Sequence, residues 1–148
     1  MLKIVTVLVL TCVSFFALGQ GESALSKDGK QWNFGLPGYV GLDFAVHDMV
    51  TVGPKIVYEL FNNNNTFKAG VVGDFHFNQL IGIPSNFDFY AGVSAGWRFK
   101  SDDNKGTDGF DIGGQVGGRW FWSDKWGLNL EFGFSGFVGG GLGVTMRM

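Results

Sequence analysis

The sequence predicts an all-β protein, a closed eight-stranded antiparallel transmembrane β-barrel with up-and-down topology. Apolar and polar residues alternate with a period of two, and turn-forming residues interrupt this alternation at regular intervals. The 148 residues include 25 glycines and 16 phenylalanines. Such alternation is typical of a strand with two different faces, and many short strands rich in glycine and aromatic residues are typical of barrels.

The N-terminal segment has the pattern of an export signal. Lys3 precedes an apolar run over residues 4–16, and residues 17–19 form a small-x-small cleavage pattern. The run holds about 15 apolar residues, whereas a transmembrane helix needs about 20. The predicted segments are a signal peptide at 1–19, a polar leader at 20–29 and the barrel at 30–148.

Composition limits the possible function classes. Cys12 is the one cysteine and lies inside the predicted signal peptide, so we expect neither a disulfide scaffold nor thiol catalysis. The formal net charge of −2 gives no reason to expect a nucleic-acid partner. Beyond the signal peptide no apolar run approaches 18 residues and no stretch of useful length has a helical period, so we expect no transmembrane helix.

Eight runs with a period of two follow one another, and we expect each to form one strand. They are residues 30–36, 38–47, 50–61, 66–77, 87–100, 109–122, 125–135 and 140–148. Their apolar faces, in chain order, carry Trp32, Phe34 and Leu36; Val40, Leu42, Phe44 and Val46; Val52, Ile56, Tyr58 and Leu60; Phe67, Ala69, Val71, Phe75 and Phe77; Phe87, Phe89, Ala91, Val93, Ala95, Trp97 and Phe99; Phe110, Ile112, Val116, Trp120 and Trp122; Trp126, Leu128, Leu130, Phe132 and Phe134; and Leu142, Val144, Met146 and Met148. Pro54 interrupts the third run, because proline cannot donate to a ladder.

Three features predict which face points outward. The apolar face carries more than 30 large side chains, too many for the interior of an eight-stranded barrel. The polar face is rich in glycine, which leaves room for long side chains in a narrow lumen. Its charges also balance, as expected of buried groups that must be paired. We therefore expect the apolar face to meet lipid and the polar face to line a plugged lumen.

The predicted lumen network consists of six acids and six bases. The acids are Asp43, Glu59, Asp74, Asp88, Asp111 and Glu131, and the bases are Lys55, Lys68, Arg98, Lys100, Arg119 and Arg147. Aromatic residues of the apolar face gather towards the strand ends, as expected of the girdles at two membrane interfaces. The predicted girdle residues are Phe75, Phe77, Phe87, Phe89, Trp97, Phe99, Phe110, Trp120, Trp122 and Trp126.

The signal peptide, the eight strands and the closing GLGVTMRM together resemble the small outer-membrane β-barrel proteins of Gram-negative bacteria, of the OmpX and OmpA-barrel type. The resemblance covers roughly residues 30–148. It implies a C-terminal signal for the barrel-insertion machinery, with Gly143, Met146 and Met148 at its positions and Met148 where the family usually has phenylalanine. It also implies that both termini face the periplasm.

This orientation places the connection after the fifth strand outside the cell. Its predicted outer-loop residues are Asp102, Asp103, Asn104, Lys105 and Asp108. They lack the spacing of an EF-hand loop, so we expect no metal site there. The interpretation that assigns no function to these residues is an acidic, solvated loop.

Some small barrels of this kind modify lipids, and that chemistry needs a nucleophile beside a base. His47 and His76 are the two histidines, and we expect both to face the lumen at the periplasmic ends of their strands. Ser94 has no histidine at its level, so we predict no nucleophile–base pair and no cofactor.

The sequence therefore predicts an integral protein of the cell outer membrane, non-enzymatic, with a structural or surface-interaction role. Its expected partners are outer-membrane lipid and the insertion machinery, and the expected state is a monomer. Two alternatives stay open, a soluble secreted lipocalin-like barrel that binds an apolar ligand and an outer-membrane lipid-modifying enzyme.

Overall fold

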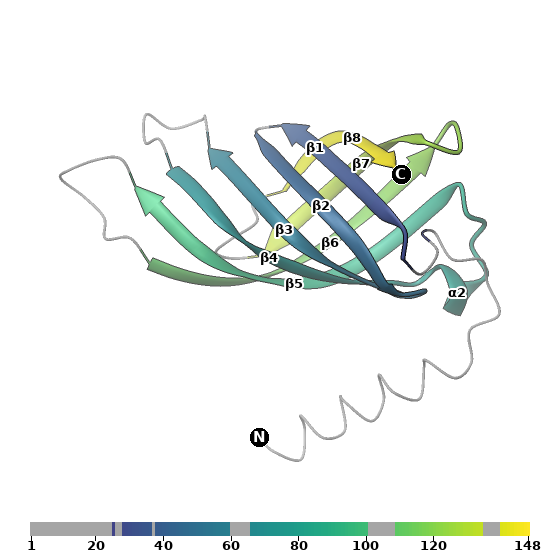
Figure 1. The fold of residues 1–148 in the computed structure, drawn as a ribbon, viewed down its shortest axis with the longest axis horizontal. Helices are drawn as coiled ribbons and strands as arrows, with labels where there is room; N and C mark the ends of the chain where they lie inside the picture. Colours follow the sequence, from purple (N-terminus) through teal and green to yellow (C-terminus); the bar gives the residue numbers. More distant parts are fainter. Residues whose placement is uncertain (1–24, 26–27, 37, 60–65, 101–108, 135–139) are drawn as a thin grey trace, which may run out of the picture.

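The computed structural model describes residues 25, 28–36, 38–59, 66–100, 109–134 and 140–148. These residues form eight antiparallel strands in sequential order, and β1 pairs with β8 to close the sheet into a barrel (Figure 1). The predicted all-β, up-and-down, eight-stranded fold is confirmed. The predicted signal peptide at 1–19 and the outer loop at 101–108 lie outside the described residues.

The strands are close to those expected from the alternation. They are β1 (Lys30–Leu36), β2 (Tyr39–His47), β3 (Val50–Glu59), β4 (Thr66–His76), β5 (Phe87–Lys100), β6 (Gly109–Phe121), β7 (Trp126–Phe134) and β8 (Gly141–Arg147). Pro54 is accommodated within β3, where it faces outward and lies opposite Val71 of β4. Asp28 and Gly29, assigned to the leader, hydrogen-bond with Ala45 of β2 and so extend the pairing of β1.

One element was not expected. The turn between β4 and β5 contains a single turn of helix, α2 (Asn78–Ile81), which ends at Gly82 with a left-handed φ of 65°. The Asn78 side chain ties this turn to β5, because its amide nitrogen donates to the Phe87 carbonyl and its amide oxygen accepts from Phe89 N–H. Among the described residues, no helix is long and apolar enough to cross a membrane.

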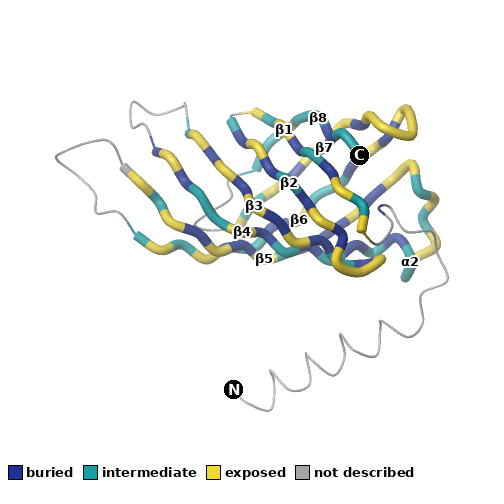
Figure 2. Tube along the Cα trace, viewed as in Figure 1, coloured by how far each residue is buried: buried dark blue, intermediate teal, exposed yellow. Residues whose placement is uncertain are grey.

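Burial alternates along the strands and places the polar face inside (Figure 2). On β5, Val93 is 68 % exposed while its neighbour Ser94 is 1 % exposed. On β2, Val40 is 42 % exposed and Asp43 is 6 % exposed. A lipocalin-like barrel would have the opposite arrangement, with apolar side chains around a cavity, so the burial pattern contradicts the lipocalin-like architecture of the soluble alternative.

His47 does not follow the expected alternation. The register between β2 and β3 shifts between Ala45 and His47, and His47 is exposed beside the turn, where its Nδ1 accepts from Met49 N–H at 3.2 Å. A bulge of this kind re-aims the side chains that follow it. Only His76 of the two histidines therefore faces the lumen.

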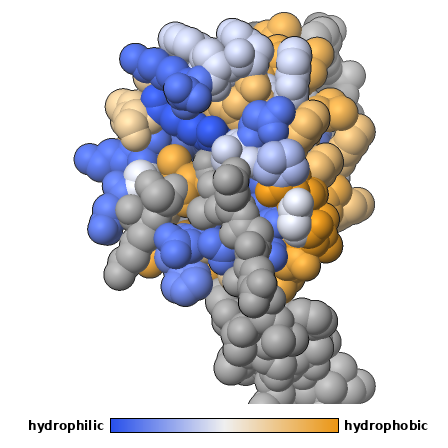
Figure 3. Space-filling model, turned by 90° about the vertical axis from the view of Figure 1, so that its right-hand side faces the viewer, coloured by the Kyte–Doolittle hydropathy of each residue, from blue (hydrophilic) through white to orange (hydrophobic). Residues whose placement is uncertain are grey.

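The end of the barrel at α2 is closed by side chains and by the β4–β5 turn. Met49 and Phe121 are 1 % and 4 % exposed there. Arg147, at the end of β8, stacks 3.4 Å from the Phe121 ring and donates to the Ser85 carbonyl at 2.8 Å. Figure 3 views this end, where hydrophilic and apolar residues gather on different parts of the face.

The closing pair of strands approaches closely at Gly143. A Cβ atom added to this residue of β8 would overlap the Phe34 carbonyl and the Cα of Gly35 on β1. The predicted insertion-signal glycine thus also has a packing reason to lack a side chain.

We expect Gly143→Ala to destabilise the barrel by about 1–3 kcal/mol, because the added methyl group pushes β8 away from β1. Gly114→Ala is the matched control, since its Cβ would meet neighbours only at ordinary contact distances of 3.6–3.8 Å. Urea unfolding in detergent micelles, followed by tryptophan fluorescence, measures both. Equal stability of the two variants would contradict the close approach.

Candidate functional site in the lumen

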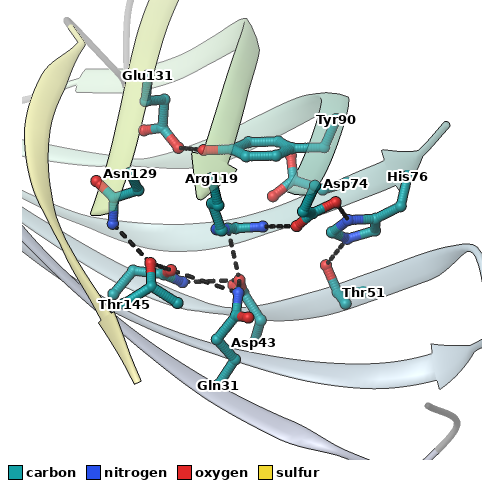
Figure 4. Close-up of polar contacts among 12 residues, drawn as sticks. Gln31, Asp43, Thr51, Asp74, His76, Tyr90, Arg119, Asn129, Glu131 and Thr145 are labelled. Atoms are coloured by element: carbon teal, nitrogen blue, oxygen red, sulfur yellow. Dashed lines mark hydrogen bonds and ion pairs between the residues drawn. The ribbon is translucent and has the colours of Figure 1, made fainter. Parts of the chain in front are cut away.

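Arg119 of β6 occupies the centre of the polar lumen and is 4 % exposed (Figure 4). One guanidinium nitrogen donates to Asp88 Oδ2 of β5 at 2.7 Å and another to Asp43 Oδ2 of β2 at 3.0 Å. The guanidinium also lies 4.0 Å from the centroid of the Tyr90 ring. Arg119 therefore joins opposite sides of the barrel through charged hydrogen bonds, which are stronger than neutral ones.

A second ion pair crosses the lumen from β3 to β7. Lys55 Nζ donates to Glu131, and both side chains are buried. The other oxygen of Glu131 accepts from the Tyr90 hydroxyl at 2.8 Å. Because Tyr90 also packs under Arg119, the two ion pairs share one aromatic ring and form a connected network.

Neutral side chains extend the network around the closing strands. The Tyr39 hydroxyl donates to Asn129 Oδ1 at 2.5 Å, and Asn129 donates to Thr145 Oγ1 at 2.8 Å. Thr145 in turn donates to Asn33 Oδ1 at 2.8 Å, and Asn33 donates to Asp43 at 2.7 Å. This directed chain runs from β2 through β7, β8 and β1 and returns to the carboxylate that binds Arg119.

Three residues near the α2 end form a hydroxyl–imidazole–carboxylate chain. Thr51 Oγ1 lies 2.9 Å from His76 Nε2, and His76 Nδ1 lies 2.6 Å from Asp88 Oδ1. The order of groups is that of a nucleophile, a base and an orienting acid. However, Thr51 is only 2 % exposed and Asp88 already binds Arg119, so no substrate reaches this hydroxyl in the structure.

Four more residues of the predicted network form two pairs farther along the lumen, towards the end opposite α2. Lys68 Nζ lies 2.6 Å from Glu59, whose side chain is 42 % exposed. Arg98 Nε lies 3.6 Å from Asp111 Oδ2, a distance too long for a hydrogen bond. Both pairs are more exposed than the central network, and solvent weakens them accordingly.

The remaining three residues of the predicted network are Asp74, Arg147 and Lys100, and for the first two the structure shows contacts other than an ion pair across the lumen. Asp74 accepts from the Gln115 amide at 2.6 Å, a neutral partner. Arg147 contacts Ser85 and Phe121 at the closed end of the barrel, outside the central network. Lys100 ends β5, and its side chain lies outside the described part of the structure.

The predicted girdle residues lie on the outer face, near both ends of the strands. Phe87 lies opposite Trp120 at the α2 end, and Trp97 lies opposite Phe110 at the other end. The exposed members are Phe87, Phe89, Trp97, Phe99, Phe110, Trp120, Trp122 and Trp126, whereas Phe75 and Phe77 are half-buried against each other, with ring centroids 5.2 Å apart.

The insertion-signal positions lie along β8 and just past its end. Met146 lies between Trp32 of β1 and Trp126 of β7, and Met148 is 58 % exposed.

The alternation in the sequence places Asn33, Thr51 and Gln115 on the polar face, which lines the lumen. The predicted network contained only charged residues and therefore omitted these three. Among the described residues, no cluster of three or more metal-ligating side chains is arranged to hold an ion.

Comparison with known proteins supports the fold alone. No protein-family model matches the chain, and no curated protein matches it in sequence. The crystal structure of the N-terminal β-barrel domain of Pseudomonas aeruginosa OprF is similar, with a TM-score of 0.54 and 10 % sequence identity. The match covers 82 % of this chain and 98 % of that domain.

We expect Arg119→Met to cost about 3–5 kcal/mol of unfolding free energy, because it leaves Asp43 and Asp88 as buried carboxylates without their cation. Lys68→Met is the control and should cost about 1 kcal/mol or less, since its partner Glu59 stays solvated. Urea titration of both refolded proteins tests this difference. Similar losses would show that Arg119 does not hold the network together.

Proposed function

We propose that this protein is an integral outer-membrane β-barrel with a plugged polar lumen and a structural or surface-interaction role. The observation that carries the proposal is the outer surface of the barrel. On it the exposed large side chains are almost entirely apolar, from Phe34 and Val40 through Val93 and Ile112 to Phe132. Water does not favour such a continuous apolar surface, whereas lipid does.

The closed sheet supports the same proposal. In hydrocarbon every backbone N–H and C=O must be bonded within the protein, and a closed barrel is the strand architecture that achieves this. The exposed aromatic residues at both ends of the strands suit the two membrane interfaces. The similarity to the OprF barrel domain, from a Gram-negative bacterium, favours the outer membrane as its location.

A non-enzymatic role accounts best for the polar lumen. Thr51, the one hydroxyl aligned with His76 and Asp88 in the described structure, is buried. The hydrogen bonds among these three side chains instead connect β3, β4 and β5, as expected of a structural network. We further propose a monomer, with Gly143, Met146 and Met148 presented to the insertion machinery during assembly.

Substitution of an outward valine by arginine tests membrane insertion. Val93→Arg, near the middle of β5, should destabilise the barrel in phospholipid vesicles by about 2–4 kcal/mol, whereas Val46→Arg, near the α2 end, should cost about 0–1 kcal/mol. Both valines are more than half exposed, so packing losses are similar. Unfolding in vesicles measures the difference, and equal small losses would argue against a lipid-facing wall.

Electrical recordings test the plugged lumen. Side chains fill an eight-stranded barrel, and here Arg119, Lys55 and Glu131 cross it. We therefore expect no steady porin-like conductance from the purified protein in planar bilayers. Stable steps on the nanosiemens scale from a monomer would contradict the proposal.

A further inference from the structure

The barrel wall is much taller on one side than on the other, and its longest strand, β5, has twice as many residues as β1 or β8. Strands β4, β5 and β6, the tall wall, have 11, 14 and 13 residues. Strands β8 and β1, the short wall, have 7 residues each. With about 3.3 Å per residue and a tilt of about 40°, the short wall rises roughly 18 Å and β5 roughly 35 Å.

The difference in height falls at the end opposite α2. At the α2 end the two sides are level, because Arg147 at the end of β8 donates to the Ser85 carbonyl just before β5. At the other end, β4, β5 and β6 reach well past β8, β1 and β2 (Figure 1). The short wall therefore stops partway up the molecule.

The outer surface of the short wall is apolar up to its last residues. Phe34 and Leu36 on β1 are 41 % and 72 % exposed, and Leu142 on β8 is 59 % exposed. At this height β1 ends at Leu36 and β8 begins at Gly141, and backbone groups that no neighbouring strand bonds need water or headgroups as partners. An apolar band on such barrels is about 25 Å tall, so a flat bilayer matched to β5 would bury the ends of β1 and β8 in hydrocarbon.

We propose that the bilayer is locally thin beside β8 and β1, so that the short wall contacts shortened or disordered lipid acyl chains. This inference rests on the proposed function. A bilayer adapts to a short span by thinning at a modest cost per ångström, whereas unbonded backbone groups in hydrocarbon cost more.

Lipid suits this surface better than a second copy of the chain. The short wall is two strands wide, so its outline measures roughly 10 by 18 Å, or about 180 Å². A stable protein interface needs about 800 Å² on each partner. The apolar surface has no boundary at the edges of the short wall but continues onto Val40 of β2 and Leu128 of β7, as expected of a wall that lipid surrounds rather than of a bounded protein interface.

Two spin-labelled variants of the full chain test the proposal, each carrying Cys12→Ser so that one thiol remains. Leu142→Cys reports on the short wall and Val93→Cys on the tall wall. Leu142 lies five residues from the end of β8 and Val93 six residues from the start of β5, so both stand at similar heights above the α2 end. Heat-modified migration on gels verifies that each variant has folded.

Collisions with oxygen and with a water-soluble nickel chelate measure the depth of each label in dioleoylphosphatidylcholine vesicles. We expect the ratio of nickel to oxygen accessibility to be several-fold higher at Leu142 than at Val93. In thinner dilauroyl vesicles the difference should shrink, because that bilayer already fits the short wall.

Other outcomes overturn the inference in distinguishable ways. Equal, deep positions for the two labels would mean that the bilayer stays flat. A Leu142 label shielded from both reagents would mean that another protein surface, such as a second copy, covers the short wall. A Val93 label open to nickel would show that the barrel does not span the bilayer, and the proposed function itself would then fail.

Discussion

Pairing of β1 with β8 closes the sheet into a barrel, and both faces of the wall follow from this closure. Without it, the first and last strands would each expose a row of unbonded backbone groups, and the alternating side chains would have no separate inside and outside. The pairing requires close contact, which Gly143 permits by lacking a side chain where the Phe34 carbonyl approaches. Closure thus allows one sequence pattern to supply both an apolar exterior and a polar, buried interior.

The interior shows how such a lumen is kept stable despite its charges. Removing a charge from water is costly unless a partner and further hydrogen bonds compensate. Arg119 has two carboxylates and an aromatic ring as neighbours, and Glu131 has Lys55 and Tyr90. Neutral side chains add further contacts, as Asn33 does for Asp43, whereas Arg119 Nε has no hydrogen-bond partner among the described residues.

Sequence alternation was enough to predict the fold class and the direction of almost every side chain, because the period of a strand is a local property. Partners across the lumen are not local. Lys55 meets Glu131 on β7, although β2 and β4 are its neighbours in the sheet, because barrel tilt sets the heights of facing residues. The alignment of Thr51, His76 and Asp88 likewise depends on the register of three strands.

The alternation of apolar and polar residues did not predict two local features, α2 and the bulge before His47. The helix α2 is four residues long, which is too short to leave a helical period, and it depends on the left-handed Gly82 and the hydrogen bonds of Asn78. The bulge before His47 changes the parity of the strand, and nothing in the flanking residues marks its place. Charge alone also overstated the role of Arg147, whose place at the closed end follows from the fold of the β4–β5 turn.

The hydrogen-bonded chain that passes through the closing strands has a consequence for assembly. Thr145 and Asn33 are 112 residues apart in the sequence, and Tyr39 and Asn129 are 90 apart. Both bonds require β8 to lie beside β1, so no hairpin of sequential strands makes them, and a barrel that has not closed keeps these polar groups without their native partners. Contacts between distant residues form slowly, because the chain loses the entropy of closing a long loop before these contacts stabilise it. Pairing of β8 with β1 therefore completes the interior and the wall together, which favours cooperative folding of this small barrel.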